Sequence, residues 1–404
     1  MNTVFFNYRY SNSRLEFKID GDDDFIKRQV IRSEGKRCMT LKQKTLYIEL
    51  DEDPKLCNDH LGLIFILAFH PILECNETVS VIFPFTVSQT FLDAIKINWI
   101  LPNIEINSEI DDNLSIYKLE GVTILYGGGL DSFAIKLLMQ DFPGIRLVNQ
   151  INECDEICAG SGVDYIKTNI RDLYSVYGLP LWVSIMIVGI INKSKYLMSG
   201  GQLTSSYLFD GLQYKDRTKN LWLSVVMKNL GIHNCNFPFL SEVSNTEIVF
   251  KHKELEKAMF CTFTNNKEGK CTKCTKCLRK FMLMACYDHK YIKQIEMFDL
   301  SHDTFTTFFS RKTLYFADIF LFCVKKLLPY NSKNIGIIHE YLKQYDISDS
   351  SFLSRYYKTP LDEYDEEIKG YLIQKLHSLD IKPMNENDIH SMINYKHSKR
   401  SNHN

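Results

Sequence analysis

Alternating apolar and polar positions predict β-strands in the first part of the chain. The segments TVFFNYRY, RLEFKI, TLYIEL and VSVIFPF alternate with the period of two that a half-buried strand requires. The segment LGLIFILAFHPIL is continuously apolar, which predicts a buried helix. We therefore expect residues 1–118 to form an α+β domain. Because this domain carries no recognisable motif, we expect it to have an accessory or docking role.

The pattern changes after residue 118, where strands and helices alternate. VTILY, IRLVNQ, VDYIKTN and KYLMSG predict strands, and DSFAIKLLMQ, LPLWVSIMIVGIINK and TEIVFKHKELEKAM predict helices. This alternation predicts an α/β domain over residues 119–300 with a doubly wound parallel sheet, in which ligands bind beyond the carboxyl ends of the strands. The loops after VTILY and KYLMSG lie at such ends, so we expect them to face one pocket.

The last part of the chain is predicted to be a helical extension over residues 301–404. Apolar residues recur at helical spacing in KTLYFADIFLFCVKKLL, IGIIHEYLKQY and LDEYDEEIKGYLIQKLHSL. The final segment, KHSKRSNHN, is polar and is expected to be disordered.

Composition and charge bear on the partners and the compartment of the protein. The 404 residues are 45% hydrophobic and 24% charged, with a net charge of −1, so neither nucleic acid nor an acidic membrane is required as a partner. The start, MNTVFFNYRY, lacks the pattern of a signal peptide, and the longest apolar stretches are too short to span a bilayer. These features predict a cytoplasmic protein with no membrane partner, whose 12 cysteines are reduced.

A glycine-rich connection joins VTILY to the helix that follows it. Gly127, Gly128 and Gly129 stand in a row there, although a tight turn needs only one residue with a positive φ. Bare backbone before a helix exposes N–H groups at the positive end of the helix dipole, where phosphate binds. Leu130 and Asp131 come next, so the Gly-Lys-Ser/Thr ending of a Walker A loop is absent, as is the glycine spacing of a dinucleotide-binding loop.

Four of the cysteines are clustered and predict a metal site. Cys261, Cys271, Cys274 and Cys277 have the spacing C-x9-C-x2-C-x2-C. The two overlapping C-x2-C steps bring three thiolates around one centre, and the preceding loop can return the fourth. Four thiolates suit a closed, tetrahedral and structural zinc site, and an iron–sulfur cluster is the less favoured alternative.

A zinc deaminase is a competing interpretation of the same segment. The tripeptide HKE that begins at His252 lies upstream of Cys271 and Cys274, which is similar to the His-x-Glu … Pro-Cys-x-x-Cys signature of those enzymes. However, Lys270 stands where the proline belongs, and two cysteines would be left over. Residues 245–260 also predict one long helix with His252 in its middle, which disfavours this alternative.

The two motifs together resemble one enzyme family. The segment GGGLDS, from Gly127 to Ser132, resembles the Ser-Gly-Gly-x-Asp-Ser loop of ATP pyrophosphatases. Followed by C-x9-C-x2-C-x2-C-Leu-Arg, it resembles 7-cyano-7-deazaguanine synthase of the queuosine pathway, and more broadly the synthase-like proteins of bacterial antiphage-defence operons (type IV CBASS-like or related). SKYLMSGGQ and NCNFPFLSEVSNTEIVFKH are similar to further segments of that family, so the resemblance spans roughly residues 120–290.

The chain departs from this family in several places. Gly127 replaces the first serine of the loop, Asn245 stands where a lysine is usual, and no Tyr-Pro … Arg substrate segment is evident after Gly201. The housekeeping synthase is also much shorter, with its loop close to the N terminus. The long segments before and after the resemblance place the chain in the specialised branch.

The resemblance implies which residues act. ATP, with Mg²⁺, would place its β- and γ-phosphates on the glycine loop, where backbone N–H groups stabilise the departing pyrophosphate. Ser132 would donate its hydroxyl to pyrophosphate, and Asp131 would hold Mg²⁺ or orient the loop, although a carboxylate in a first helical turn is also ordinary. Arg279 would contact the substrate, the alternative being an arginine on a helix surface. The implied ATP-binding residues are Gly127, Gly128, Gly129, Leu130, Asp131, Ser132, Gly200 and Gly201.

The implied reaction is an ATP-dependent ligation that releases AMP and pyrophosphate. It would adenylate the carboxylate of 7-carboxy-7-deazaguanine and pass the acyl group to an amine. The long flanks favour a protein acceptor encoded in the same operon, whereas ammonia would lead to the free nitrile. Two other classes stay open, a non-catalytic nucleotide sensor and a nucleic-acid binder that uses the basic cysteine loop. The second is disfavoured because aromatic residues are not interleaved with the lysines of that loop.

Overall fold

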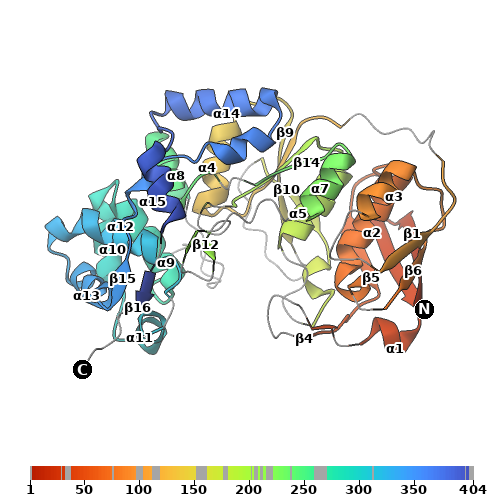
Figure 1. The fold of residues 1–404 in the computed structure, drawn as a ribbon, viewed down its shortest axis with the longest axis horizontal. Helices are drawn as coiled ribbons and strands as arrows, with labels where there is room; N and C mark the ends of the chain where they lie inside the picture. The colour runs from red at the N-terminus through yellow and green to blue at the C-terminus, as the bar shows by residue number, and fades with distance from the viewer. Residues whose placement is uncertain are drawn as a thin grey trace. The chain divides into compact units, whose positions relative to one another are not determined.

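The chain folds as a mixed α/β protein with parallel strands and many helices, as a computed structural model shows (Figure 1). Contacts group it into two units. Unit 1 comprises Met1–Leu125, Pro143–Ser199 and Leu221–Cys235, and unit 2 comprises Tyr126–Phe142, Gly200–Asn220 and Asn236–Asn404. These units do not coincide with the domain boundaries predicted after residues 118 and 300. The structure describes residues 2–28, 30–31, 38–74, 77–96, 103–111, 119–151, 162–175, 181–201, 203, 208–209, 213–214, 222–236, 239–258, 271–311, 314–395 and 397–399.

The N-terminal part of unit 1 contains a five-stranded mixed sheet. Its strands are β1 (Asn2–Ser11), β2 (Arg14–Gly21), β5 (Thr45–Glu49), β6 (Val79–Ile82) and β7 (Ile104–Asn107). They lie in the order β5-β2-β1-β6-β7, with β1 antiparallel to β2 and parallel to β6. In β2, Leu15, Phe17 and Ile19 are buried, as the period of two requires. The strands predicted in this region are therefore confirmed.

The apolar segment in this part of the chain forms the predicted helix, α2 (Asn58–Leu73). All residues from Asp59 to Leu73 are buried, which explains why the segment shows no polar face. The smaller elements nearby are α1 (Asp23–Ile26), β3 (Val30–Ile31), β4 (Cys38–Met39) and α3 (Gln89–Lys96).

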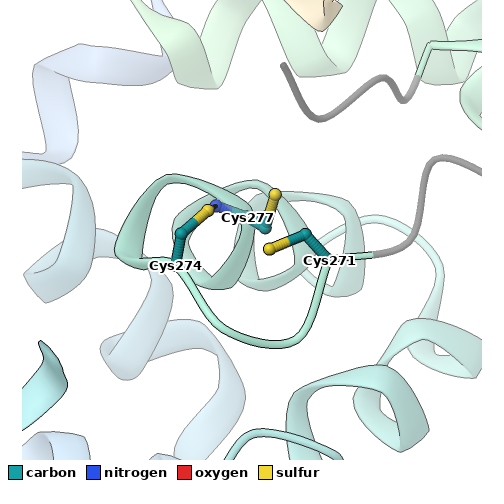
Figure 2. A group of neighbouring side chains, drawn as sticks. All are labelled: Cys271, Cys274 and Cys277. Carbon is teal, nitrogen blue, oxygen red and sulfur yellow. Dashed lines mark hydrogen bonds between the residues drawn. The ribbon is translucent and has the colours of Figure 1, made fainter. Parts of the chain in front are cut away.

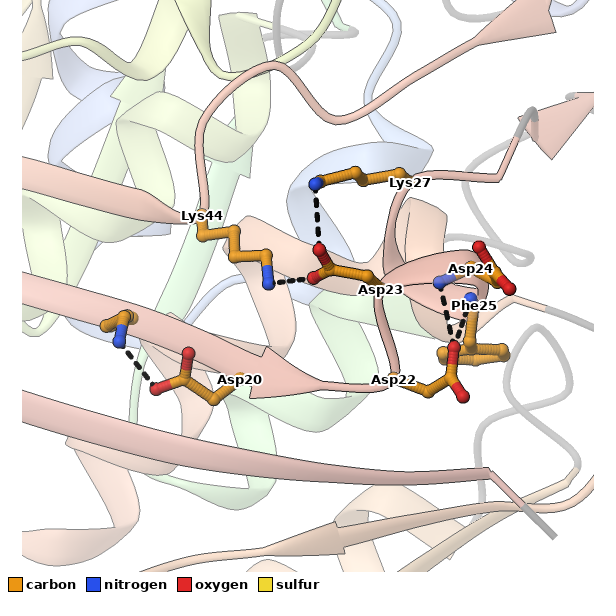
Figure 3. A network of polar contacts seen from close by, with 8 residues as sticks. Asp20, Asp22, Asp23, Asp24, Phe25, Lys27 and Lys44 are labelled. Atoms are coloured by element: carbon orange, nitrogen blue, oxygen red, sulfur yellow. Dashed lines mark hydrogen bonds and ion pairs between the residues drawn. The ribbon is translucent and has the colours of Figure 1, made fainter.

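Acidic residues fix the short helix α1 to the edge of this sheet (Figure 3). The Asp22 carboxylate caps the helix by accepting hydrogen bonds from the backbone N–H groups of Asp24 and Phe25, at 2.8 and 3.2 Å. Asp23 forms ion pairs with Lys27 and Lys44. Hydrogen bonds from these two lysines lower the pKa of the Asp23 carboxyl to about 2. These residues serve local structure around α1.

A second sheet in unit 1 contains the strands predicted after residue 118. It consists of β8 (Val122–Leu125), β9 (Ile145–Ile151), β10 (Asp164–Lys167), β11 (Tyr196–Ser199) and β14 (His233–Asn236). The order is β10-β9-β8-β11-β14, and the pairs β10–β9, β9–β8 and β8–β11 are parallel. The strand order reverses between β8 and β11, since the chain moves outward in one direction from β8 to β10 and then returns to the other side of β8.

Two helices of unit 1 connect strands of this sheet, α5 (Leu181–Ile191) before β11 and α7 (Trp222–Asn229) before β14, and η1 (Ile170–Asp172) is a single 3₁₀ turn. α5 packs closely on β11, because a Cβ atom at Gly189 would lie only 1.8 Å from Cδ2 of Leu197. A glycine is therefore required there. The predicted helix LPLWVSIMIVGIINK is confirmed by α5.

Unit 2 is mainly helical. Its helices are α4 (Leu130–Met139), α8 (Glu242–Lys251), α9 (Thr275–Ala285), α10 (Ile292–Glu296), α11 (Asp303–Phe309), α12 (Ala317–Leu327), α13 (Lys333–Leu342), α14 (Glu366–Ser378) and α15 (Glu386–Ile393). It also contains the 3₁₀ turns η3 (Leu255–Lys257), η4 (His289–Tyr291), η5 (Leu328–Tyr330), η6 (Ser351–Ser354) and η7 (Thr359–Glu363). The short strands are β12 (Leu208–Phe209), β13 (Gln213–Tyr214), β15 (Tyr345–Ile347) and β16 (His397–Lys399). α4 packs against α8, and α8 packs against α9, so these three helices lie next to one another.

Two predictions of local structure in unit 2 are wrong. The single helix predicted over residues 245–260 ends at Lys251, because Lys253 adopts a left-handed φ of 60° and its N–H bonds back to Phe250. The polar C-terminal segment is also partly ordered, since β16 pairs antiparallel with β15. Backbone hydrogen bonds to a distant strand provide an order that the local composition did not predict. The rest of that segment lies outside the described residues.

Within the residues that the structure describes, no helix is long and apolar enough to cross a membrane.

Candidate functional site

The glycine loop ends in an uncapped helix N terminus. Gly129 is the N-cap of α4 and, lacking a side chain, it makes no side-chain capping bond to the first turn. Gly128 has a φ of 69°, which favours glycine, whereas a Cβ atom at Gly127 would meet no atom within 4 Å. The turn alone therefore explains one glycine. The other two leave bare backbone N–H groups at the positive end of α4.

The loop after β11 lies against the first turn of α4. A Cβ atom at Gly200 would be 3.0 Å from Cβ of Asp131 and 3.3 Å from the backbone nitrogen of Ser132. The two glycine segments therefore lie next to each other, and this close approach explains the glycine at position 200. The pocket that we expect them to face stays a prediction. Ser132 is buried, and its hydroxyl donates to the carbonyl of Gly129 at 3.0 Å.

The Asp131 carboxylate faces two side chains from neighbouring helices. Nζ of Lys280, on α9, lies 3.9 Å from one carboxylate oxygen. Nδ2 of Asn245, on α8, donates to the other oxygen at 3.4 Å. Burial raises the pKa of the Asp131 carboxyl above its usual range, and the Lys280 ammonium opposes this shift. The carboxylate is therefore held in a place where a cation, from lysine or a metal, favours its charged form.

Asn245 and Lys280 are themselves buried. The side chain of Lys280 is 8% exposed, and Asn245 is 0% exposed. Among the described residues, Oδ1 of Asn245 has no hydrogen-bond partner. An unsatisfied buried acceptor costs about 1–3 kcal/mol, so its retention here calls for an explanation such as a bound ligand or ion.

Arg279 is part of a buried ion pair and does not lie on a helix surface. Its Nε and Nη2 atoms donate to the two carboxylate oxygens of Glu242 at 2.6 and 2.8 Å. The Arg279 guanidinium also lies over the ring of Phe316, 3.6 Å from its centroid. The surface alternative is thus wrong. A direct contact of Arg279 with substrate stays a prediction, and the contacts seen join α9 to α8.

Three of the four predicted metal ligands come together at the start of α9 (Figure 2). One Sγ atom from each of Cys271, Cys274 and Cys277 lies within 4.8 Å of the others. Backbone N–H groups donate to the sulfurs of Cys271 and Cys274 at 3.4 Å each. Sulfurs bound to one tetrahedral zinc are about 3.8 Å apart, so the group fits that ion. Cys261, the fourth predicted ligand, lies outside the described residues.

The geometry around His252 does not favour a deaminase. His252 is the C-cap of α8, where its Nδ1 lies 2.8 Å from the carbonyl oxygen of Ile248. The group of candidate ligands found among the described residues consists of cysteines alone. A helix C terminus is a favourable place for an imidazole for electrostatic reasons, and this explains the residue without a metal.

A hollow of about 480 Å³ lies beside the start of α9. Cations and aromatic rings are mixed on its walls, which the sequence did not predict because the rings come from α11 and the start of α12. Phe316 has a φ of 61°, an unusual backbone conformation for a bulky side chain. The lining residues are Thr275, Lys276, Arg279, Thr304, Phe308, Arg311, Tyr315 and Phe316.

Lys280 and Glu242 are buried at the site, although no motif in the sequence singles them out. One signal was present, because Lys280 follows Cys277 by three residues and so lies on the same face of a helix.

The fold and these sites define an α/β protein with a candidate anion site and a candidate thiolate metal site. A family model described as a family of unknown function (DUF6395) matches residues 223–396. The matched span contains Asn245, Lys280 and the three clustered cysteines, but not the glycine loop. Neither a curated protein nor a solved structure matches the chain.

Proposed function

We propose that the protein is an ATP-dependent ligase that adenylates a carboxylate and releases AMP and pyrophosphate. The observation that carries the proposal is the uncapped N terminus of α4, with Gly200 packed against its first turn. Backbone N–H groups and the helix dipole favour the binding of phosphate at such a place. The Walker lysine, which serves chemistry at the γ-phosphate, is missing from the loop.

The strand order of the second sheet supports the same location. In doubly wound sheets, ligands bind outside the carboxyl ends of the strands where the order reverses. Here the reversal falls between β8 and β11, and the glycine loop and Gly200 follow those two strands in the chain. We infer that residues 119–300 have the doubly wound fold of the adenine nucleotide alpha hydrolases.

The side chains around the loop suit the cleavage of ATP at the α-phosphate. A carboxylate oxygen of the substrate attacks the α-phosphorus, the bond to the β-phosphate oxygen breaks, and pyrophosphate leaves toward the loop N–H groups. Asp131 would hold Mg²⁺, because a carboxylate is a preferred Mg²⁺ ligand. Ser132 would donate its hydroxyl to pyrophosphate after rotation away from the carbonyl of Gly129.

The second half of the reaction transfers the acyl group to an amine. The amine nitrogen attacks the acyl carbon, the bond to AMP breaks, and the nitrogen loses a proton to give an amide. The resemblance suggests 7-carboxy-7-deazaguanine as the acid and a protein from the same operon as the amine, in antiviral defence. Ammonia as the amine, with dehydration to the nitrile after a second adenylation, is the alternative.

Zinc would have a structural role in this scheme. The three clustered cysteines, with Cys261 as the fourth ligand, would form a closed site that leaves no position for a substrate. The ion would hold the loop before α9 and the first turn of that helix.

The proposal is tested by incubating the protein with ATP, Mg²⁺ and 7-carboxy-7-deazaguanine and separating the nucleotides by chromatography. AMP and pyrophosphate are expected, and Asp131→Ala should abolish them. Asp141→Ala is the matched control, because Asp141 lies just beyond α4 with a side chain that is 61% exposed. ADP as the product would refute the proposal. ATP binding without turnover of this acid or of other acids would favour the nucleotide sensor.

The acceptor is identified by intact-mass spectrometry of operon partners co-expressed with the protein. A partner that gains the mass of the deazaguanine acyl group supports a protein acceptor. Formation of the free nitrile with ammonia at full rate, with no partner modified, would establish the alternative.

The hollow beside α9 favours a second candidate function, the binding of single-stranded nucleic acid. Bases stack on exposed aromatic rings while cations contact the phosphates, and Tyr315 is 48% exposed beside Lys276 and Arg311. A fluorescent oligonucleotide should bind more weakly as salt is raised. Equal binding by wild type and a Tyr315→Ala, Arg311→Gln variant would remove this candidate.

A further inference from the structure

Lys280 is a buried cation that points toward the glycine loop. A Cβ atom at Gly129 would lie 3.4 Å from Nζ of Lys280, so the ammonium lies beside the N-cap of α4. Among the described residues its one recorded charged partner is Asp131, at 3.9 Å. That distance exceeds a hydrogen bond, although an ammonium has three N–H groups to donate. A lysine that is 8% exposed is therefore left with donors available next to a helix N terminus.

A second buried group at the same place is also incompletely bonded. Asn245 uses its Nδ2 to hold Asp131, and its Oδ1 has no hydrogen-bond partner among the described residues. Buried polar atoms normally have partners, in protein or solvent. Two incompletely satisfied side chains therefore converge on the first turn of α4, where the backbone N–H groups are also uncapped. This arrangement suits an anion that accepts from the lysine, together with a cation or water that donates to the amide oxygen.

Helix α9 connects Lys280 to the cysteine cluster. Cys274 is the N-cap of α9 and Cys277 lies in its first turn, so an ion bound by both would fix the start of this helix. Lys280 follows Cys277 by three residues, a rise of about 4.5 Å along the helix. The Arg279–Glu242 pair fixes the same turn to α8, which also carries Asn245. The position of the ammonium is thus set from two sides.

We propose that Lys280 binds a phosphate group held at the N terminus of α4, and that the metal bound by the cysteines positions α9 so that Lys280 reaches it. The identity of the anion as the pyrophosphate part of ATP rests on the proposed function. The lysine that the glycine loop lacks is then supplied by α9, from a residue about 150 positions later in the chain. The site binds phosphate only when the metal site is filled.

The test is calorimetric titration of the full-length, zinc-loaded protein with inorganic pyrophosphate and Mg²⁺. Lys280→Met should weaken pyrophosphate binding about 10- to 100-fold, because a hydrogen bond from a charged group contributes that much. Lys280→Arg should keep most of the affinity, since the charge remains. Lys293→Met is the matched control, because Lys293 is an exposed lysine on α10 that lies in neither candidate site, and this variant should bind as wild type does.

Folding is checked separately, so that a lost binding signal is not misread. Far-ultraviolet circular dichroism and zinc content of Lys280→Met should match wild type. If that variant does not fold, Lys280→Gln is titrated in its place and should show a similar loss. Wild-type affinity in either folded variant, or no pyrophosphate binding by the wild type, would overturn the assignment of Lys280.

The role of the metal is tested with Cys274→Ser. Its pyrophosphate affinity should fall to that of Lys280→Met, and combining the two changes should cause no further loss, because both act on one contact. Undiminished binding by metal-free Cys274→Ser would overturn the coupling.

The proposed function and this inference fail in different ways. Lysine-dependent pyrophosphate binding without any AMP formation would contradict the ligase and leave the inference standing. AMP formation by a Lys280→Met variant that binds pyrophosphate as tightly as wild type would support the ligase and contradict the inference about Lys280.

Discussion

The buried pair of Arg279 and Glu242 offers the sharpest test of how unit 2 is held together. The two side chains are 8% and 2% exposed and share two hydrogen bonds of 2.6 and 2.8 Å. Removal of one partner leaves a full charge buried without compensation, which costs about 3–5 kcal/mol. Natural domains are stable by about 5–15 kcal/mol, so Glu242→Leu should remove a large part of the stability of unit 2.

The loss of stability comes from the single charge that stays buried, and not from the loss of the ion pair itself. When both partners are replaced, as in Arg279→Met with Glu242→Leu, no charge is left buried, and much of the stability should return. The single change Arg279→Met should again be costly, because the Glu242 carboxylate then stays in an apolar place. Glu256→Gln is the control, since Glu256 forms an exposed pair with Lys290 at 2.7 Å and surface pairs contribute little.

Two probes of urea unfolding separate the units. Circular dichroism follows helices, of which unit 2 holds the larger share among the described residues, whereas the chain's three tryptophans belong to unit 1. The circular dichroism transition of Glu242→Leu should move down by about 1 M urea or more, and the fluorescence transition should move much less. A double variant no more stable than Glu242→Leu alone would refute the reasoning, as would a single variant as stable as the control.

Three further predictions concern other parts of the chain. His60 is 1% exposed and burial lowers the pKa of its imidazole to about 4. As the pH falls, the unfolded chain therefore takes up a proton at this histidine before the folded chain does. The free energy of unfolding should fall by up to about 3 kcal/mol between pH 6.5 and pH 4. Urea titrations of His60→Gln should lack this pH dependence. Gly200→Ala should lower the melting temperature in a thermal-shift assay, because its Cβ atom would lie 3.0 Å from Cβ of Asp131. Gly127→Ala is the control, since a Cβ atom there would have no neighbour within 4 Å. Equal melting temperatures of the two variants would contradict this packing. Cys274→Ser should lose zinc by elemental analysis while Cys286→Ser, a buried thiol at the end of α9, keeps it; full zinc in both would exclude the cluster.

Local patterns predicted the elements of the fold well because their physical causes are local. Alternation predicted β2 and its neighbours, and a continuously apolar segment predicted α2, whose residues are buried on all sides. The end of α8 was missed because it depends on Lys253, a residue type that rarely adopts a left-handed φ. The strand β16 was missed because its partner, β15, lies about 50 residues away in the chain.

The candidate site was predictable only where its residues are close in sequence. The glycine loop and the three clustered cysteines are short motifs, so their spacing alone predicted an anion site and a metal site. Lys280, Asn245 and Asp131 come from three helices, and no local pattern brings them together. Their convergence follows from the packing of α4 on α8 and of α8 on α9, which is long-range information.

The Arg279–Glu242 and Lys280–Asp131 pairs of unit 2 differ in a way that separates structure from function. Arg279 and Glu242 are in direct contact, so each charge already has its partner and a ligand would gain little from either. Lys280 and Asp131 stand 3.9 Å apart, so the ammonium opposes the rise that burial causes in the pKa of the Asp131 carboxyl, but the distance is too long for a hydrogen bond. Such a pair can exchange partners at low cost, because Mg²⁺ can take the carboxylate while a phosphate oxygen takes the ammonium. Magnesium pyrophosphate supplies the cation and the phosphate oxygen together. We therefore expect the chemistry at Lys280 and Asp131, and not at Arg279 and Glu242, which already bond to each other.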